Sequence, residues 1–357
     1  MRRARQNLEA SPDVCIAGAG IIGLALALEL HRCGARVTVL DRDTALSHTS
    51  IAAAGMLAAQ DPENPSQLKP LSERSVALYP QFLSSIEALS GCAVPFQTSR
   101  TFQAHPSYAN AFDSAMLPAL TPGSNHFQML DERSVDPRQL AAALLAAVRN
   151  TTITIREHTA LRSAVDSNRN IRLDTTTGSL DTPYLVHTQG AWSLTSVIPR
   201  KGQMLSVGLP SSLKLRDVIR TTDIYIVPRT QGPRAGHALI GATVEDVGFD
   251  TTTHDVDLVY LRNQAARLLP QLADEKLCPT VDRWAGLRPG TPDALPLLGR
   301  LTDDSNQFVA VGHYRNGILL APATAEVLAQ IIIGRESEVD LTPFSPQRFP
   351  AKDGIAQ

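Results

Sequence analysis

The sequence predicts an α/β protein with two domains, and three observations carry this prediction. A strand, a glycine-rich turn, a helix and a second strand follow one another from residue 14. A β-rich region fills residues 204–240, and a second strand–glycine–helix passage begins at residue 308. Because the first and last passages share one arrangement, we expect the C-terminal part to rejoin the N-terminal domain. A length of 357 residues agrees with more than one core.

The expected elements follow from apolar runs, helical patterns and turn residues. Continuous apolar runs bounded by glycine or charge indicate strands buried on both faces. Asp136 and Pro137 suit the N-cap and the first turn of a helix over residues 138–148. The other expected helices are 20–33, 71–89, 256–269 and 319–333, the expected strands are 14–17, 36–40, 152–156, 171–175, 184–187, 204–207, 224–227, 238–240 and 308–311, and residues 92–128 are expected to be irregular.

Composition excludes several classes of protein. The formal net charge is −2, without a long basic run, so no nucleic-acid partner is expected. The arginines near the N-terminus precede polar residues, unlike a signal peptide, and no apolar stretch is long enough to span a membrane. The histidines and cysteines show no metal-ligand spacing. Four cysteines without a CxxC pair favour a reduced, cytoplasmic protein.

The N-terminal turn carries a dinucleotide-binding fingerprint. Gly18, Gly20 and Gly23 match the pattern GxGxxG between a strand and a helix, and Asp41 ends the next strand. In such a Rossmann-like unit the glycines permit the tight turn, the close approach of a pyrophosphate and the packing of helix on strand. The helix N-terminus attracts the phosphates, and an acid such as Asp41 accepts hydrogen bonds from ribose hydroxyls. These residues alone leave NAD and FAD open.

Later motifs favour FAD. A small-residue segment spans residues 48–57, and four further motifs follow in order at residues 224–229, 241–245, 284–293 and 312–324. Together they resemble the glycine oxidase branch of the D-amino acid oxidase family, which serves thiamine synthesis, from about residue 12 to residue 335. A departure lies at residues 186–189, where polar residues replace an alanine-rich strand end, so an altered loop beside the FAD is expected.

The resemblance implies a non-covalent FAD, because no cysteine follows Cys278 near the C-terminal flavin motif. It also implies a role for each matching position. Arg288 would hold the substrate carboxylate, Tyr225 would donate its hydroxyl, and Arg315 would lie nearby. The implied FAD contacts are Gly18, Gly20, Ile21, Ile22, Gly23, Asp41, Arg42, Thr49, Ser50, Ala54, Gly55, Met56, Leu161, His313, Tyr314, Arg315, Asn316, Gly317, Ile318 and Leu319.

The implied activity is oxidation of glycine, sarcosine or D-alanine by hydride transfer to flavin N5. Molecular oxygen would be the acceptor, giving a 2-oxo acid, ammonia and hydrogen peroxide. Three alternatives stay open: a D-amino acid oxidase or dehydrogenase, a sarcosine oxidase-like enzyme, and a non-catalytic FAD-binding protein. The joint presence of Tyr225, Arg288 and Arg315 speaks against the last alternative, because such a protein has no need of carboxylate-binding groups.

The expected domains are discontinuous. A Rossmann-like FAD-binding domain would comprise residues 12–90, 135–200 and 285–340. A mixed or antiparallel β-sheet domain for the substrate would comprise residues 91–134 and 201–284. Residues 1–11 and 341–357 are expected to be flexible or peripheral tails, and a homo-oligomer stays open.

Overall fold

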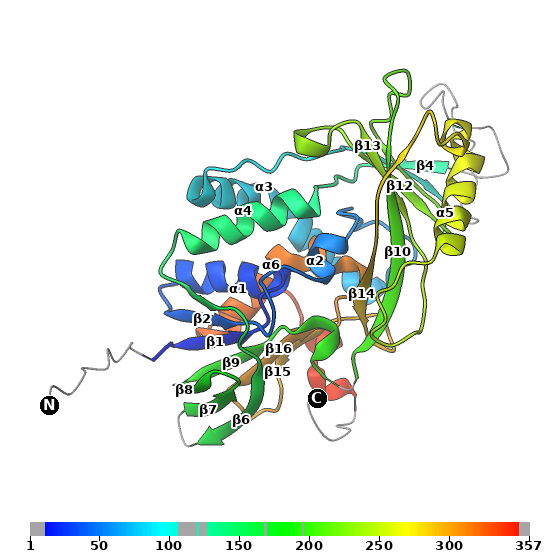
Figure 1. Cartoon of the computed structure of the whole chain (residues 1–357). Helices are drawn as coiled ribbons and strands as arrows, with labels where there is room; N and C mark the ends of the chain where they lie inside the picture. Colours follow the sequence, from blue (N-terminus) through cyan, green and yellow to red (C-terminus); the bar gives the residue numbers. More distant parts are fainter. Residues whose placement is uncertain (1–10, 106–119, 121–126, 168–169, 195, 350–357) are drawn as a thin grey trace, which may run out of the picture.

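A computed structural model describes residues 11–105, 120, 127–167, 170–194 and 196–349, and it confirms the predicted α/β class. Two lobes lie side by side (Figure 1). One lobe holds a mostly parallel sheet covered by helices, and the other holds a large mixed sheet with a helix on its outer side. Segments from both ends of the chain meet in the first lobe, as the sequence predicts.

The first lobe is built on a six-stranded sheet. Its strands are parallel to their neighbours except at one edge, where β15 runs antiparallel to β16. The C-terminal β16 reaches the N-terminal β1 through β9, which lies between them. In spatial order the strands are β15 (Leu297–Arg300), β16 (Gln307–Val311), β9 (Tyr184–His187), β1 (Val14–Ala17), β2 (Val37–Leu40) and β5 (Thr154–Arg156).

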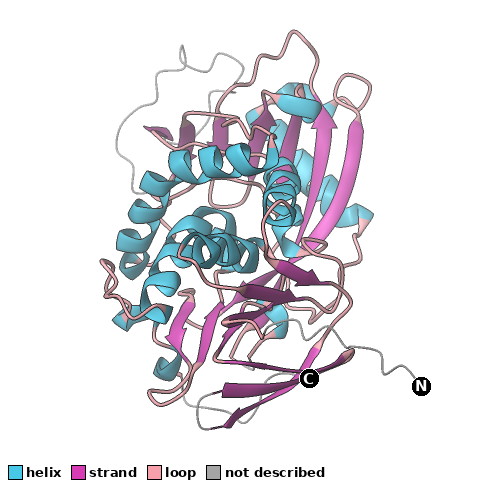
Figure 2. Ribbon diagram, turned by 90° about the vertical axis from the view of Figure 1, so that its left-hand side faces the viewer, coloured by secondary structure: helices cyan, strands magenta, loops and turns pink. Residues whose placement is uncertain are grey.

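Four long helices gather beside this sheet, and their apolar faces form the largest core of the protein. Figure 2 shows a group of helices that lies between the strands of the two lobes. The predicted cap of α4 is present, because the Asp136 side chain accepts a hydrogen bond from the Arg138 amide at 3.0 Å. The helices are α1 (Ile21–Arg32), α3 (Lys69–Ser90), α4 (Pro137–Arg149) and α6 (Gly317–Ile332).

The second lobe is a seven-stranded sheet whose neighbours are antiparallel except for β11 and β3. Helix α5 (Asp255–Leu268) packs on its outer side, and its other face is turned toward the first lobe. In spatial order the strands are β14 (Thr280–Gly290), β10 (Ile198–Gly208), β13 (His237–Gly241), β12 (Tyr225–Arg229), β11 (Val218–Arg220), β3 (Thr101–Ala104) and β4 (Phe127–Leu130).

Smaller elements complete the structure. A three-stranded antiparallel sheet of β6, β7 and β8 packs beneath the six-stranded sheet. The short helix α2 begins the small-residue segment found in the sequence. The bounds are β6 (Leu161–Ser167), β7 (Asn170–Thr175), β8 (Gly178–Thr182), α2 (Thr49–Ala52), η1 (Ser66–Leu68), η3 (Gly190–Trp192), η4 (Gly232–Arg234), η5 (Pro270–Ala273), η6 (Tyr314–Asn316), η7 (Thr342–Phe344) and η8 (Pro346–Arg348).

Several expectations need correction. Residues 92–128, expected to be irregular, contain β3 and the start of β4. The motif at residues 284–293 lies mostly in β14, although its glycines and prolines suggest a turn. Strand β14 also continues past the expected domain boundary at residue 285. Nearly every residue of β6 is at least partly exposed, so this strand lacks the apolar run that would reveal it.

The C-terminal segment also differs from the expected tail, although residues 350–357 lie outside the described part of the chain. Phe344 is 1% exposed and belongs to the main core. Arg348 forms an ion pair with Asp293 at 2.7 Å and donates to backbone carbonyls of residues 295 and 296. Residues 342–349 therefore anchor the segment that leads from β14 to β15.

Phe344→Ala tests this anchoring. Removing a fully buried phenylalanine side chain costs about 3–5 kcal/mol of unfolding free energy, through lost burial and a residual cavity. Urea unfolding of the purified protein should show this loss, whereas Val165→Ala, at a position 61% exposed on β6, should stay within about 0.5 kcal/mol of the parent protein. Equal unfolding free energies for both variants would mean that the segment contributes nothing to the core.

Candidate functional site

A single cavity of about 1080 Å³ runs between the two lobes. This volume lies at the upper end of the range for ligand pockets, about 300–1,000 Å³, and suits a ligand larger than a single amino acid. Most of the site residues predicted from the sequence line it: Gly18, Gly20, Ile21, Ile22, Asp41, Arg42, Thr49, Ser50, Ala54, Gly55, Met56, Leu161, Tyr225, Arg288, His313, Tyr314, Arg315, Asn316, Gly317 and Ile318.

One end of the cavity has the geometry of a phosphate-binding turn. Gly18 has φ of +113°, and a Cβ there would lie 2.6 Å from the Thr188 carbonyl oxygen, so only glycine fits. Gly23 does not line the cavity, because it packs against the Gly18 backbone with no room for a side chain. Helix α1 has no side-chain cap at Gly20, which leaves amide N–H groups and the positive helix end for an anion.

Asp41 and its neighbours form the adjoining wall. The Asp41 carboxylate accepts hydrogen bonds from the Ala19 amide at 2.6 Å and the Asp43 amide at 2.9 Å. These two bonds fix the carboxylate at the edge of the cavity and leave it further lone pairs for ribose hydroxyls. The Arg42 guanidinium lies 4.3 Å from the centre of the Trp192 ring, and Leu161 lines the cavity from the start of β6.

The polar strand end that departs from the family pattern is satisfied within the protein. Thr188 donates toward the carbonyls of Ala17 and Gly18 at 3.0 and 2.7 Å, beside the phosphate-binding turn. The His187 ring lies within hydrogen-bond distance of the side chains of Gln189 and Gln307. These contacts tie β9 to its surroundings and explain how polar residues are accommodated there.

The small-residue segment is held from three sides by the seven-stranded sheet. Thr49 Oγ1 donates to the Leu287 carbonyl at 2.7 Å, and Trp284 Nε1 donates to the Ala52 carbonyl at 3.0 Å. Arg229, the buried last residue of β12, donates to the Ala54 carbonyl at 2.9 Å. A Cβ at Gly286 would lie 2.6 Å from the Ala52 side chain, so the segment and β14 touch directly. These contacts therefore fix the position of the segment relative to the seven-stranded sheet.

The C-terminal flavin motif supplies the opposite wall. Helix α6 begins at Gly317, which lines the cavity, so the positive end of the helix faces the cavity. No side chain caps this end. His313 is buried against Thr324, and burial lowers the pKa of its ring to about 3. The ring is therefore neutral at physiological pH. Leu319, predicted as an FAD contact, does not line the cavity and is 1% exposed within the main core.

Arg288 and Tyr225 lie together in the part of the cavity bounded by the seven-stranded sheet. A Cβ at Gly202 would overlap the Arg288 guanidinium, and a Cβ at Gly241 would lie 2.6 Å from the Tyr225 hydroxyl. Two glycines thus make the space that these side chains fill. Burial raises the pKa of the Tyr225 hydroxyl while the nearby Arg288 charge lowers it, and the net direction is upward. Tyr225 therefore stays protonated and can donate.

Arg288 has no acidic partner among the residues that the structure describes. Its Nη1 donates to the Thr243 carbonyl at 3.1 Å and approaches the Lys201 carbonyl at 3.5 Å. Neighbouring cations are matched instead: Lys201 meets Glu245 at 3.3 Å and Asp250 at 3.1 Å. A partly buried guanidinium without a carboxylate is costly unless a ligand supplies the anion. The geometry therefore indicates an anion site.

Arg315 lines the same cavity but is already paired. Its Nη1 lies 2.7 Å from Glu63, and its Nη2 lies 3.5 Å from Asp61. The sequence predicts Arg315 close to the substrate carboxylate, and these acidic partners make it a weaker anion site than Arg288.

Several lining residues were missed by sequence reasoning. Asp61 and Arg220 come from segments without a recognisable motif, and the tip of the β11–β12 hairpin contributes residues 221–224. Arg220 pairs with Tyr225 across these two strands, so both lie on one face of the sheet. Strand β11 has three residues, too few for a visible alternation. The other missed lining residues include Ala242, Val244 and Phe249, and also Thr159, Ala160, Arg162, Ser163 and Ala164, which flank the predicted Leu161.

Two searches of the described residues give further bounds on the site. No group of three or more His, Cys, Asp or Glu side chains is arranged to hold a metal ion. No helix in the same residues is long and apolar enough to cross a membrane. None of the four cysteines lines the cavity, and none forms a disulfide.

Comparison with known proteins assigns the family. The model of the FAD dependent oxidoreductase family, DAO, matches residues 13–331. The chain therefore belongs to the FAD dependent oxidoreductases, and its cofactor is FAD.

Relatives and solved structures agree with this assignment. The chain is 36% identical to the Bifunctional protein ThiO/ThiG of Trichormus variabilis, over 94% of this chain and 55% of that protein. It is 30% identical to the glycine oxidase of Geobacillus kaustophilus, over 96% of this chain and 98% of that enzyme. The crystal structure of that oxidase matches with a TM-score of 0.86, covering 95% and 99% of the two chains. The chain spans about half the length of the ThiO/ThiG proteins, which are the first relatives that it matches.

The residues that line the cavity fit the parts of FAD, which successive segments of the chain would hold. The turn at Gly18 and helix α1 would hold the pyrophosphate, Asp41 the ribose, and the segment at Thr49–Met56 together with the start of α6 the flavin ring. The long shape, the glycines without room for a Cβ and the two uncapped helix ends all suit an anionic dinucleotide with a flat ring.

Acid precipitation tests the expectation that this FAD is non-covalent. Because the cysteines lie away from the cavity, no thiol can form a thioether to the ring. The yellow colour should pass into the supernatant, and chromatography should identify it as FAD. Flavin that stays with the precipitated protein would contradict this expectation.

Proposed function

We propose that the protein is a glycine oxidase, which converts glycine or D-alanine to a 2-oxo acid, ammonia and hydrogen peroxide, and converts sarcosine to glyoxylate, methylamine and hydrogen peroxide. The observation that carries the proposal is Arg288: an unpaired guanidinium beside a protonated Tyr225 hydroxyl, in the cavity that fits FAD. We further propose a role in thiamine biosynthesis, in keeping with the sequence resemblance and with relatives named ThiO/ThiG.

The chemistry of the substrate end suits an amino acid. A guanidinium binds a carboxylate through two parallel hydrogen bonds, which fixes both position and orientation. The Tyr225 hydroxyl adds a further donor, so the α-carbon is held at a defined place relative to the flavin-lining segment. Because the sheet and that segment are joined directly, the substrate and the ring would share one rigid frame.

FAD, when bound, accepts the hydride from the α-carbon and passes two electrons to oxygen, which becomes hydrogen peroxide. The remaining atoms balance without a protein group: the resulting imine takes up one water and splits into glyoxylate and ammonia. No general base is assigned, since a neutral amine releases hydride directly. His313 is buried in its neutral form against Thr324, which fits a wall of the flavin site rather than a base.

The comparisons support glycine oxidase over the alternatives. The full-length relative with 98% coverage carries that name, and so does the structure with a TM-score of 0.86. A D-amino acid oxidase or dehydrogenase would need the same Arg288 and differs in substrate size and electron acceptor. We also propose a reducing, cytoplasmic setting, because four cysteines without a disulfide suit such a compartment.

Peroxide production from candidate amines tests the proposal. Glycine, sarcosine and D-alanine should each release hydrogen peroxide and consume oxygen, with glycine or sarcosine giving the highest kcat/KM. D-Phenylalanine and D-methionine should be poor substrates. A kcat/KM for either bulky D-amino acid well above that for glycine would place the protein among the D-amino acid oxidases. Flavin reduction by glycine without oxygen uptake would indicate a dehydrogenase.

Substitutions at Arg288 test the carboxylate site. Losing one partner of a desolvated charge pair costs roughly 2–5 kcal/mol, so Arg288→Ala should lower kcat/KM for glycine about thirty-fold to a few thousand-fold. Arg288→Lys should recover only part of this loss, because a point charge lacks the two-pronged geometry. Steady-state peroxide production measures the loss, and the flavin spectrum verifies that FAD is retained.

Arg315→Ala serves as the comparison, and it should cost less because acidic residues already neutralise Arg315. If Arg288→Ala keeps a near-normal kcat/KM while Arg315→Ala loses it, the assignment of the two arginines must be reversed.

A further inference from the structure

The substrate end of the cavity extends beyond Arg288 and Tyr225 to a second, acidic wall. Asp61 and Glu63 reach it from the loop after the flavin-lining segment, and Asp223 reaches it from the β11–β12 hairpin. Against these three carboxylates stand two guanidinium groups, those of Arg220 and Arg315. The cavity lining thus carries both an unmatched cation at Arg288 and an excess of carboxylates at this wall.

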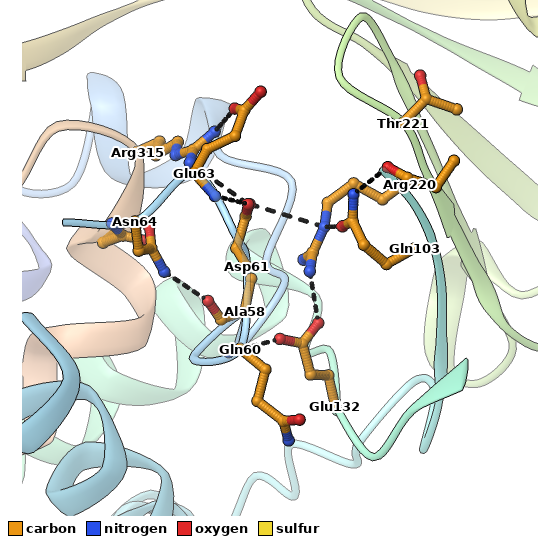
Figure 3. Close-up of polar contacts among 12 residues, drawn as sticks. Ala58, Gln60, Asp61, Glu63, Asn64, Gln103, Glu132, Arg220, Thr221 and Arg315 are labelled. Atoms are coloured by element: carbon orange, nitrogen blue, oxygen red, sulfur yellow. Dashed lines mark hydrogen bonds and ion pairs between the residues drawn. The ribbon is translucent and has the colours of Figure 1, made fainter. Parts of the chain in front are cut away.

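A buried carboxylate already balances the charge of Arg220. Its side chain is 4% exposed, and its Nη2 lies 2.9 Å from the buried carboxylate of Glu132. Its Nε donates to Gln103 and lies 3.6 Å from Asp61 (Figure 3). Nη1 and Nη2 are both buried, and neither makes a hydrogen bond among the described residues, so the charge of Arg220 is balanced through the Glu132 ion pair. Arg220 also supports Asp61.

Asp61 is the group with binding capacity left. Its side chain is 8% exposed and lies between Arg220 and Arg315, as Figure 3 shows. The two arginine nitrogens are 3.6 and 3.5 Å away, longer than a normal hydrogen bond, and the Glu63 amide donates to Oδ1 at 3.0 Å. An ionised carboxylate offers about four lone-pair sites, so Asp61 can still accept from an N–H donor in the cavity.

We propose that Asp61 receives the amino group of the substrate and restricts the enzyme to amines with a single carboxylate. This inference rests on the proposed function, since Arg288 must hold the first carboxylate. An amino acid with one carboxylate and an amine N–H donor then finds a partner for each group in the cavity. A second carboxylate attached near the nitrogen faces Asp61, and like charges a few ångströms apart in a partly desolvated site repel strongly.

A matched pair of substrates measures this selectivity. Sarcosine and iminodiacetate are both secondary amines of glycine, and iminodiacetate adds one carboxylate to the N-methyl group. With the wild-type holoenzyme, kcat/KM for sarcosine should exceed that for iminodiacetate on the order of a hundredfold. A ratio near one would overturn the proposal without any variant. If neither glycine nor sarcosine reduces the flavin under anaerobic conditions, the proposed function itself fails.

Asp61→Asn assigns the selectivity to this residue. The amide keeps the shape of the side chain but not its charge, so the ratio should fall to within about tenfold while kcat/KM for sarcosine also falls. Asp61→Glu should keep most of the discrimination. Asp181→Asn removes a carboxylate from an exposed ion pair with Arg172, far from the cavity, and should leave the ratio unchanged.

FAD content and the flavin spectrum verify folding of each variant. A loaded Asp61→Asn protein that keeps the wild-type ratio would contradict the proposal. If Asp61→Asn fails to hold FAD, the Asp61→Glu variant and the wild-type ratio decide: the proposal requires discrimination in both.

Discussion

The direct attachment of the flavin-lining segment to the seven-stranded sheet is the contact on which the site depends. Thr49 bonds to the Leu287 carbonyl, one residue before Arg288, while Trp284 and Arg229 hold the carbonyls of Ala52 and Ala54. Each bond joins a residue of one lobe to a residue of the other. Because β14 carries two of the three anchoring groups as well as Arg288, this strand links the ring site directly to the carboxylate site. A looser connection would let the two lobes move apart and lose the alignment that hydride transfer requires.

Within this frame, glycines create the substrate space and charges give it direction. Gly202 and Gly241 leave the room that the Arg288 guanidinium and the Tyr225 hydroxyl occupy, and neither glycine has a positive φ. The cations near Arg288 are neutralised by their own acidic partners, as with Lys201, and Arg288 is not. The opposite wall carries its excess of carboxylates around Asp61. The cavity lining therefore offers both a free positive charge and an excess of negative charge, which together complement a small amino acid.

Local patterns in the sequence were enough for the α/β class and for the glycine-rich turn after β1, whereas the role of Arg288 was inferred from the family resemblance and stays a prediction. The cap at Asp136 depends on neighbouring residues only, and the positive φ of Gly18 suits glycine, so the sequence reveals both. By contrast, Asp61 and Arg220 lie far apart in the sequence and meet only through the pairing of β11 with β12 and β3. Leu319 belongs to the motif predicted to contact the flavin, but its position in α6 buries its side chain in the core, away from the cavity. Phe344 could not be placed because nothing local distinguishes a packed short helix from a tail.

The binding of a small carboxylate that lacks the amine of glycine tests the central claim most directly. Glycolate keeps the carboxylate of glycine and replaces the amine by a hydroxyl. Added to the wild-type holoenzyme, it should perturb the flavin absorbance with a saturable dependence on concentration and should compete with glycine in the peroxide assay. That result would place a carboxylate site beside the flavin. Two results would contradict the account. One is an unchanged flavin spectrum at glycolate concentrations as high as those at which glycine saturates the enzyme. The other is inhibition by glycolate that does not compete with glycine.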